Sequence, residues 1–122
     1  MAEIKNILIV EDETVIALSL RILLMKAGYI INGIFARGEQ AVKAALENRP
    51  DLVLMDIRLA GDMDGIEAAK QIAEHTNSPI LFMTAYSDPE VREKAMELKP
   101  LGFLQKPVKL TDIEQSLKTL CA

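Results

Sequence analysis

Short apolar runs and longer amphipathic segments alternate along the whole chain. Five mainly apolar runs occur at residues 7–10, 30–35, 52–55, 80–83 and 101–104. The first three contain almost no polar residues, as expected for strands of a parallel sheet that helices cover on both faces. Each run precedes a segment with the apolar spacing of a helix, and this alternation predicts a parallel α/β sheet.

The segments after the runs carry the signals of five helices. The first three are expected at residues 14–27, 38–47 and 65–75. Residues 87–90 read Ser-Asp-Pro-Glu, a capping residue followed by proline, and are expected to open the fourth helix. Thr111 or Asp112 is expected to cap the fifth helix.

The first predicted helix is apolar around most of its circumference. At about 100° per residue, its apolar side chains divide into two arcs. One arc comprises Ile16, Leu20, Leu23 and Leu24, and the other comprises Val15, Leu18, Ile22 and Met25. We expect the sheet to cover one arc and a neighbouring helix the other. The alternative is that the second arc is a face for self-association or for a partner.

Length and charge narrow the range of functions. The chain has 122 residues, enough for one domain, and residues 1–122 are expected to form a single unit. Its net charge is -4, and its lysine and arginine residues form no cluster. Binding to nucleic acid or to a membrane surface therefore has little support. Cys121 is the single cysteine, and no apolar stretch approaches the roughly 20 residues of a membrane span, so a cytoplasmic location is expected.

Polar side chains follow four of the five predicted strands. Glu11 and Asp12 come after the first strand, Asp56 after the third, Thr84 after the fourth and Lys106 after the fifth. Because ligands of an open parallel sheet bind beyond the carboxyl ends of its strands, these groups are candidates for one site. Carboxylates beside an ammonium suit Mg²⁺ bound together with a phosphate, and a carboxylate can itself attack a phosphoryl donor. The pattern therefore favours metal-assisted phosphoryl transfer.

These strand-end residues resemble the receiver domains of response regulators in two-component signalling. The matching segments, which extend over the whole chain, are Glu11-Asp12, Asp56, Asp64-Gly65, Thr84-Ala85 and Lys106-Pro107. The resemblance implies a flavodoxin-like, doubly wound α/β fold with five helices. Its five parallel strands would lie in the order 2-1-3-4-5.

The resemblance implies roles for the acidic residues and the lysine. Asp56 would accept a phosphoryl group from a histidine kinase. Glu11, Asp12, Asp56 and the backbone carbonyl of Arg58 would hold Mg²⁺, and Lys106 would pair with the phosphate.

The resemblance also implies a switch. Thr84, which precedes Ala85, would move toward the phosphoryl group, and Phe103 would turn inward behind it. The peptide bond between Lys106 and Pro107 is typically cis in such domains. The fourth helix, the fifth strand and the fifth helix would then present a changed surface to a downstream output protein or domain.

This chain departs from the common receiver pattern at several positions. The loop at residues 60–65 is one residue longer than usual, Glu11 replaces the more frequent aspartate, and Phe103 lacks the hydroxyl of a tyrosine. Arg58 and Tyr86 would flank the phosphoryl group. Because of their size and position, we hypothesise that they crowd or orient the attacking water and set the lifetime of the phosphorylated state.

Two other functions remain open from the sequence. A Mg²⁺-dependent phosphatase would use Asp56 as its nucleophile, but Arg58 lies where a second aspartate would act as acid and base. A protein-interaction module that never takes phosphate is disfavoured because all the acceptor-site groups are present. We therefore expect a phosphoacceptor signalling domain and not an enzyme, although the domain would assist its own phosphorylation and dephosphorylation. A homodimer is left open.

Overall fold

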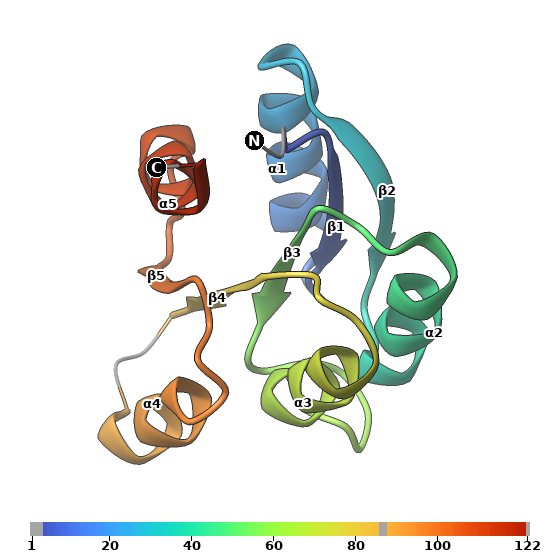
Figure 1. The fold of residues 1–122 in the computed structure, drawn as a ribbon, viewed down its shortest axis with the longest axis vertical. Helices are drawn as coiled ribbons and strands as arrows, with labels where there is room; N and C mark the ends of the chain where they lie inside the picture. Colours follow the sequence, from blue (N-terminus) through green and yellow to red (C-terminus); the bar gives the residue numbers. More distant parts are fainter. Residues whose placement is uncertain (1–3, 86–87, 122) are drawn as a thin grey trace.

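Strands and helices alternate strictly along the chain (Figure 1). The computed structural model describes residues 4–85 and 88–121. The strands are β1 (Asn6–Val10), β2 (Ile30–Phe35), β3 (Leu52–Asp56), β4 (Ile80–Thr84) and β5 (Gly102–Gln105). The helices are α1 (Thr14–Lys26), α2 (Gly38–Asn48), α3 (Gly65–His75), α4 (Pro89–Met96) and α5 (Leu110–Cys121). Each predicted strand and helix is therefore present, with ends that differ by a residue or two from the expected ones.

The five strands form one sheet in the order β2-β1-β3-β4-β5. All neighbouring strands run parallel. The strand order and the doubly wound fold implied by the resemblance are thus confirmed. In this order β1, β3, β4 and β5, the four strands followed by the candidate polar residues, lie next to one another, while β2 is an edge strand.

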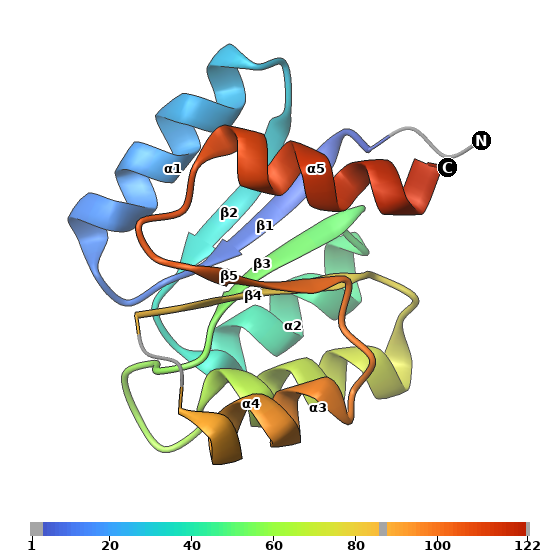
Figure 2. The same ribbon diagram turned by 90° about the vertical axis from the view of Figure 1, so that its left-hand side faces the viewer.

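Helices cover both faces of the sheet (Figure 2). On one face α1 and α5 pack over a core that includes Leu20, Leu24 and Ile113. On the other face α2, α3 and α4 pack over a core that includes Ala45, Ile72 and Ala95. Because both faces are covered, the residues of β1, β3 and β4 are almost entirely buried, as their apolar sequences predict.

Aspartate side chains cap two of the helices near the carboxyl end of the sheet. Asp64 Oδ1 accepts the Glu67 backbone N–H at 2.8 Å before α3. Asp88 Oδ1 accepts the Glu90 backbone N–H at 3.0 Å before α4. Each bond satisfies one of the free N–H groups of a first helical turn. The cap predicted for the fourth helix is therefore confirmed at Asp88, while Ser87 lies outside the described residues.

The prediction for the start of the fifth helix was wrong. We expected Thr111 or Asp112 to cap it, but α5 already begins at Leu110. The backbone N–H groups of Asp112 and Ile113 donate to the Lys109 carbonyl at 3.1 and 3.2 Å. Because the first turn closes on this earlier carbonyl, Thr111 and Asp112 lie inside the helix.

The expectation that a neighbouring helix covers the second arc of α1 was also wrong. Its side chains stay in solvent, with exposed fractions of 78% for Val15, 38% for Leu18, 52% for Ile22 and 57% for Met25. The reason is the placement of α5, which shares this face of the sheet but lies over β4 and β5 (Figures 1 and 2). A groove separates α1 from the chain after β5, and α1 lines it mainly with residues of the other arc, Ile16, Leu20 and Leu23, together with Val15.

Candidate functional site

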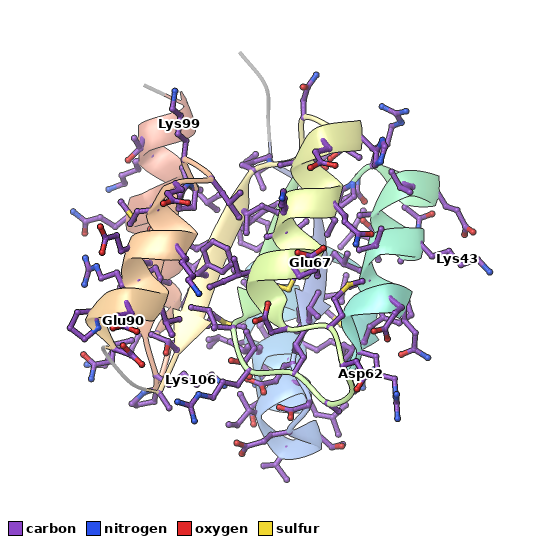
Figure 3. The ribbon with its side chains drawn as sticks, turned by 90° about the horizontal axis from the view of Figure 1, so that it is seen from below. Lys43, Asp62, Glu67, Glu90, Lys99 and Lys106 are labelled. Carbon is purple, nitrogen blue, oxygen red and sulfur yellow. The ribbon has the colours of Figure 1, made fainter. Side chains whose placement is uncertain are left out.

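Four neighbouring strands carry polar groups at their carboxyl ends. Glu11 and Asp12 follow β1, Asp56 ends β3, Thr84 ends β4, and Lys106 follows β5. Lys106 lies toward the same end of the molecule as Asp62 of the loop before α3, and Lys99 lies at the opposite end (Figure 3). The sheet order thus brings together residues that are far apart in the sequence.

Glu11, Asp12 and Asp56 form a compact acidic group. Each offers one carboxylate oxygen, and the three oxygens lie within 4.8 Å of one another. Glu11 and Asp56 are buried, with 2% and 4% of their surface exposed, whereas Asp12 is exposed. A set of carboxylate oxygens that opens to solvent on one side is the type of site in which proteins hold Mg²⁺. The three residues therefore fit a hard divalent cation.

Lys106 places its ammonium between the two buried carboxylates. Its Nζ lies 2.6 Å from Glu11 Oε1 and 2.9 Å from Asp56 Oδ2. The other oxygen, Asp56 Oδ1, accepts the backbone N–H of Arg58 at 3.2 Å. Buried carboxylates without a partner are costly in free energy. The Lys106 ammonium lowers this cost by compensating much of their charge. Both oxygens of Asp56 thus face positively polarised groups.

The close carboxylates shift the protonation of Glu11 and Lys106. The pKa of Glu11 is raised from 4.5 to about 7: burial is the largest cause, Asp56 adds to the rise, and the Lys106 ammonium partly offsets both. Burial would lower the pKa of Lys106, but the carboxylates of Glu11 and Asp56 raise it above its ordinary value. Lys106 is therefore a permanent cation near neutral pH, while Glu11 is poised to gain or lose a proton.

Thr84 and Phe103 lie on the strands beside this acidic group. Thr84 is buried at the end of β4, and its carbonyl accepts the backbone N–H of Lys106 at 2.7 Å. Phe103 is half-buried on β5, with its ring centroid 6.0 Å from that of Phe82 on β4. It packs against the core under α4. Thr84 and Phe103 therefore lie on two strands, β4 and β5, that are joined by backbone pairing.

Residues 7–118 match the family model of the response regulator receiver domain. This match extends over most of the chain. The protein belongs to the receiver domains of response regulators. The phosphatase that the sequence left open is accordingly not favoured.

Relatives and solved structures agree with this assignment. The receiver domain is 37% identical over 109 residues to the transcriptional regulatory protein PdtaR of Mycobacterium tuberculosis, covering 89% of this chain and 53% of PdtaR. It is 35% identical to sporulation initiation phosphotransferase F of Bacillus subtilis, covering 93% of this chain and 91% of that protein. The signal receiver domain of a modulated diguanylate cyclase from Desulfovibrio desulfuricans G20 superposes with a TM-score of 0.89 at 40% identity, over 96% of this chain and 93% of that chain.

The receiver domain corresponds to only part of several relatives. It spans about half the length of PdtaR. Among its described residues, no helix combines the length and apolar character needed to cross a membrane.

Arg58, Ala85 and the peptide bond between Lys106 and Pro107 complete the described part of the predicted site. Arg58 and Ala85 are exposed, and the backbone N–H of Arg58 bonds to Asp56. Tyr86 lies outside the described residues, so its proposed place beside the phosphoryl group stays a prediction. The peptide bond between Lys106 and Pro107 is cis.

Sequence reasoning missed a functional constraint at Gly65. Its N–H donates to the Ile57 carbonyl at 2.7 Å, and any Cβ at this position would collide with the Asp56 carbonyl oxygen. This close approach fixes the backbone that carries Asp56. The available signal was the glycine itself, the residue type without a Cβ, directly after the Asp64 cap of α3.

Arg92 was also missed. The guanidinium carbon of Arg92 on α4 lies 5.2 Å from the centroid of the Phe103 ring, the geometry of a cation–π contact. The two residues come from separate elements, and no local motif marks their contact. Only the packing of α4 beside β5 brings them together.

Proposed function

We propose that Asp56 is the phosphoacceptor of this receiver domain and takes its phosphoryl group from a histidine kinase. The observation that carries the proposal is the position of this carboxylate. It ends a buried strand, 2.9 Å from the Lys106 ammonium and within an acidic group of metal-binding geometry. Asp56 is thus held at the edge of the sheet where a phosphoryl donor can approach.

In the proposed transfer, an oxygen of Asp56 attacks the phosphorus atom of a phosphohistidine. The new bond joins carboxylate oxygen to phosphorus, and the bond from phosphorus to the histidine nitrogen breaks. The imidazole leaves with the electron pair of that bond. Lys106 then turns from the carboxylates to the phosphoryl oxygens, and the Thr84 hydroxyl donates to one of them.

Mg²⁺ completes the proposed site. Glu11, Asp12 and Asp56 would hold it through side-chain oxygens and Arg58 through its backbone carbonyl. When bound, it would neutralise the charge that accumulates on the phosphoryl oxygens. Because a carboxylate must be deprotonated to bind the ion, the raised pKa of Glu11 makes Mg²⁺ affinity increase with pH.

The output of the phosphorylated state would be a changed protein surface. Thr84 moves toward the phosphoryl group, and Phe103 follows it inward, so that α4, β5 and α5 present different contacts. The partners would be the kinase and an output protein or domain. We further propose that residues 1–122 act as one cytoplasmic signalling domain without turnover as an enzyme, and that Arg58 and Tyr86 set the lifetime of the phosphorylated state.

Intact-mass measurement tests the proposal directly. The wild-type chain is incubated with a small-molecule phosphoryl donor, with and without Mg²⁺, beside Asp56→Asn. Asp62→Asn, at an exposed aspartate of the neighbouring loop, is the matched control. We expect a Mg²⁺-dependent gain of one phosphoryl group in wild type and Asp62→Asn, and none in Asp56→Asn.

Two outcomes contradict the proposal. An absence of any Mg²⁺-dependent mass shift in wild type would leave only a phosphate-independent interaction module. Repeated phosphate release from unrelated phosphoesters would indicate a hydrolase.

A further inference from the structure

The ring of Phe103 has one neighbour in the core and another at the surface. Its centroid lies 6.0 Å from that of Phe82 on β4, a residue that is completely buried. The guanidinium carbon of Arg92 on α4, which is exposed, lies 5.2 Å from the same centroid. The half-buried ring of Phe103 is therefore held at the boundary between the core and the solvent.

The strand register places Phe103 on the same face of the sheet as Thr84. Phe103 pairs with Phe82, and Thr84, two residues further along β4, pairs with Gln105. Because side chains alternate along a strand, Phe82, Phe103 and Thr84 share one face. Under the proposed function, Thr84 moves toward the phosphoryl group and leaves space on this face for the aromatic ring.

We propose that Arg92 is a positioning residue of this switch: its guanidinium holds the Phe103 ring at the boundary and opposes the inward turn. This inference rests on the proposed function of Asp56. A cation attracts an aromatic ring up to about 6 Å from its centroid, and the observed distance is already 5.2 Å. An inward displacement of the ring by more than about 1 Å therefore ends the contact.

Arg92 is held on the outside while the ring turns inward. Its backbone N–H donates to the Asp88 carbonyl at 2.9 Å, and buried Ala95 fixes α4 against the core. Moving the exposed guanidinium into the apolar core behind the ring would cost the hydration of a full charge. The contact thus belongs only to the half-buried position of Phe103. A contact made in one of two positions shifts the equilibrium between them.

The sign and size of the effect follow from this difference. A cation–π contact at an exposed site changes an equilibrium about two- to fivefold. Since the contact opposes the inward turn, its loss should raise the affinity of Asp56 for a phosphoryl group by the same factor. Damage to the site itself would instead lower that affinity.

Titration with beryllofluoride in the presence of Mg²⁺ tests the proposal. Beryllofluoride is a tetrahedral substitute for a phosphoryl group on a carboxylate. NMR of the full chain, with ¹³C in its phenylalanine rings, reports both binding and ring position. The chain has three phenylalanines, so the Phe103 signal is identified by its loss in Phe103→Leu.

Arg92→Gln should lower the Kd for beryllofluoride about two- to fivefold. Before any beryllofluoride is added, its Phe103 signal should already be displaced toward the position of the bound state. Arg92→Lys keeps a cation near the ring and should have a Kd between those of Arg92→Gln and wild type. Circular dichroism establishes that each variant is folded.

Two controls separate the ring contact from the charge of α4. Lys94→Gln removes another exposed cation from the same helix and should leave the Kd unchanged. In a Phe103→Leu background, which has no ring to hold, Arg92→Gln should cause no further change in the Kd.

Three results would overturn the proposal. With normal binding in wild type, an unchanged or raised Kd in Arg92→Gln would refute the role of Arg92, while the proposed function would stand. An equal decrease of the Kd in Lys94→Gln, or in the Phe103→Leu background, would assign the effect to the net charge of α4. Absence of Mg²⁺-dependent binding in wild type would refute the acceptor site, and the role of Arg92 with it.

Discussion

Replacing Glu11 with glutamine should stabilise the metal-free protein above neutral pH. In the folded state, burial and the neighbouring Asp56 carboxylate raise the pKa of Glu11 from 4.5 to about 7. The folded protein therefore keeps a proton that the unfolded chain releases. The stability that this proton contributes is fully present below about pH 4.5 and is lost as the pH rises through 7. Glutamine resembles the protonated acid at every pH and so escapes the loss.

The size of the effect follows from the displacement of the pKa. A change from 4.5 to about 7, at about 1.4 kcal/mol for each pH unit, sets a ceiling of about 3 kcal/mol. Interaction with Lys106 and Asp56 spreads the titration over several groups, so we expect about 1 to 3 kcal/mol at pH 8. At about 4 °C for each kcal/mol, the melting temperature of Glu11→Gln should exceed that of wild type by about 4 to 12 °C.

Urea unfolding in the presence of a chelator provides the measurement. Wild type and Glu11→Gln should have similar unfolding free energies at pH 5 and diverge progressively up to pH 8. Glu47→Gln, at an exposed carboxylate on α2, is the control and should follow wild type throughout. Added Mg²⁺ should stabilise wild type more at pH 8 than at pH 5, because the deprotonated acid binds it. Parallel pH profiles for wild type and Glu11→Gln without metal would refute this reasoning.

Three further substitutions test other contacts of the site. Gly65→Ala should cost about 2 to 3 kcal/mol in urea unfolding, because the new methyl group collides with the Asp56 carbonyl; unchanged stability would contradict the close approach. Lys106→Met should cost about 2 to 4 kcal/mol at pH 8 and less at pH 5, because it leaves two buried carboxylates without their cation; equal losses at both pH values would argue against this cause. Arg92→Ala should change the free energy of unfolding by less than about 1 kcal/mol but increase the mobility of the Phe103 ring in NMR relaxation. Arg92→Lys should partly restore the wild-type mobility. An unchanged mobility in Arg92→Ala would show that the cation–π contact does not restrain the ring.

Much of the fold was predictable because its signals are local. The apolar runs of β1, β3 and β4 and the spacing of the helices depend on neighbours a few residues away. The cap at Asp88 followed by Pro89 was recognisable for the same reason. The start of α5 was misjudged, since several polar residues there are equally good caps and the backbone used an earlier carbonyl.

The chemical types of the site residues were also fixed by the sequence. Acids, a hydroxyl and a lysine at successive strand ends indicate phosphoryl chemistry as soon as the strands are known to be parallel. The order of the strands was not available from this pattern and came from the family resemblance. The strand order determines which side chains meet at the site, because it allows Lys106 to lie within 3 Å of both Glu11 and Asp56.

Tertiary structure alone decided which surfaces are covered and which distant groups touch. A helical wheel gives two apolar arcs on α1, but only the placement of α5 leaves Leu18 and Ile22 in solvent. The close approach of Gly65 to Asp56 and the contact of Arg92 with Phe103 also join separate elements. Local sequence sets the conformation of each element, whereas burial, pKa and contact depend on what packs against it, and that is a property of the whole chain.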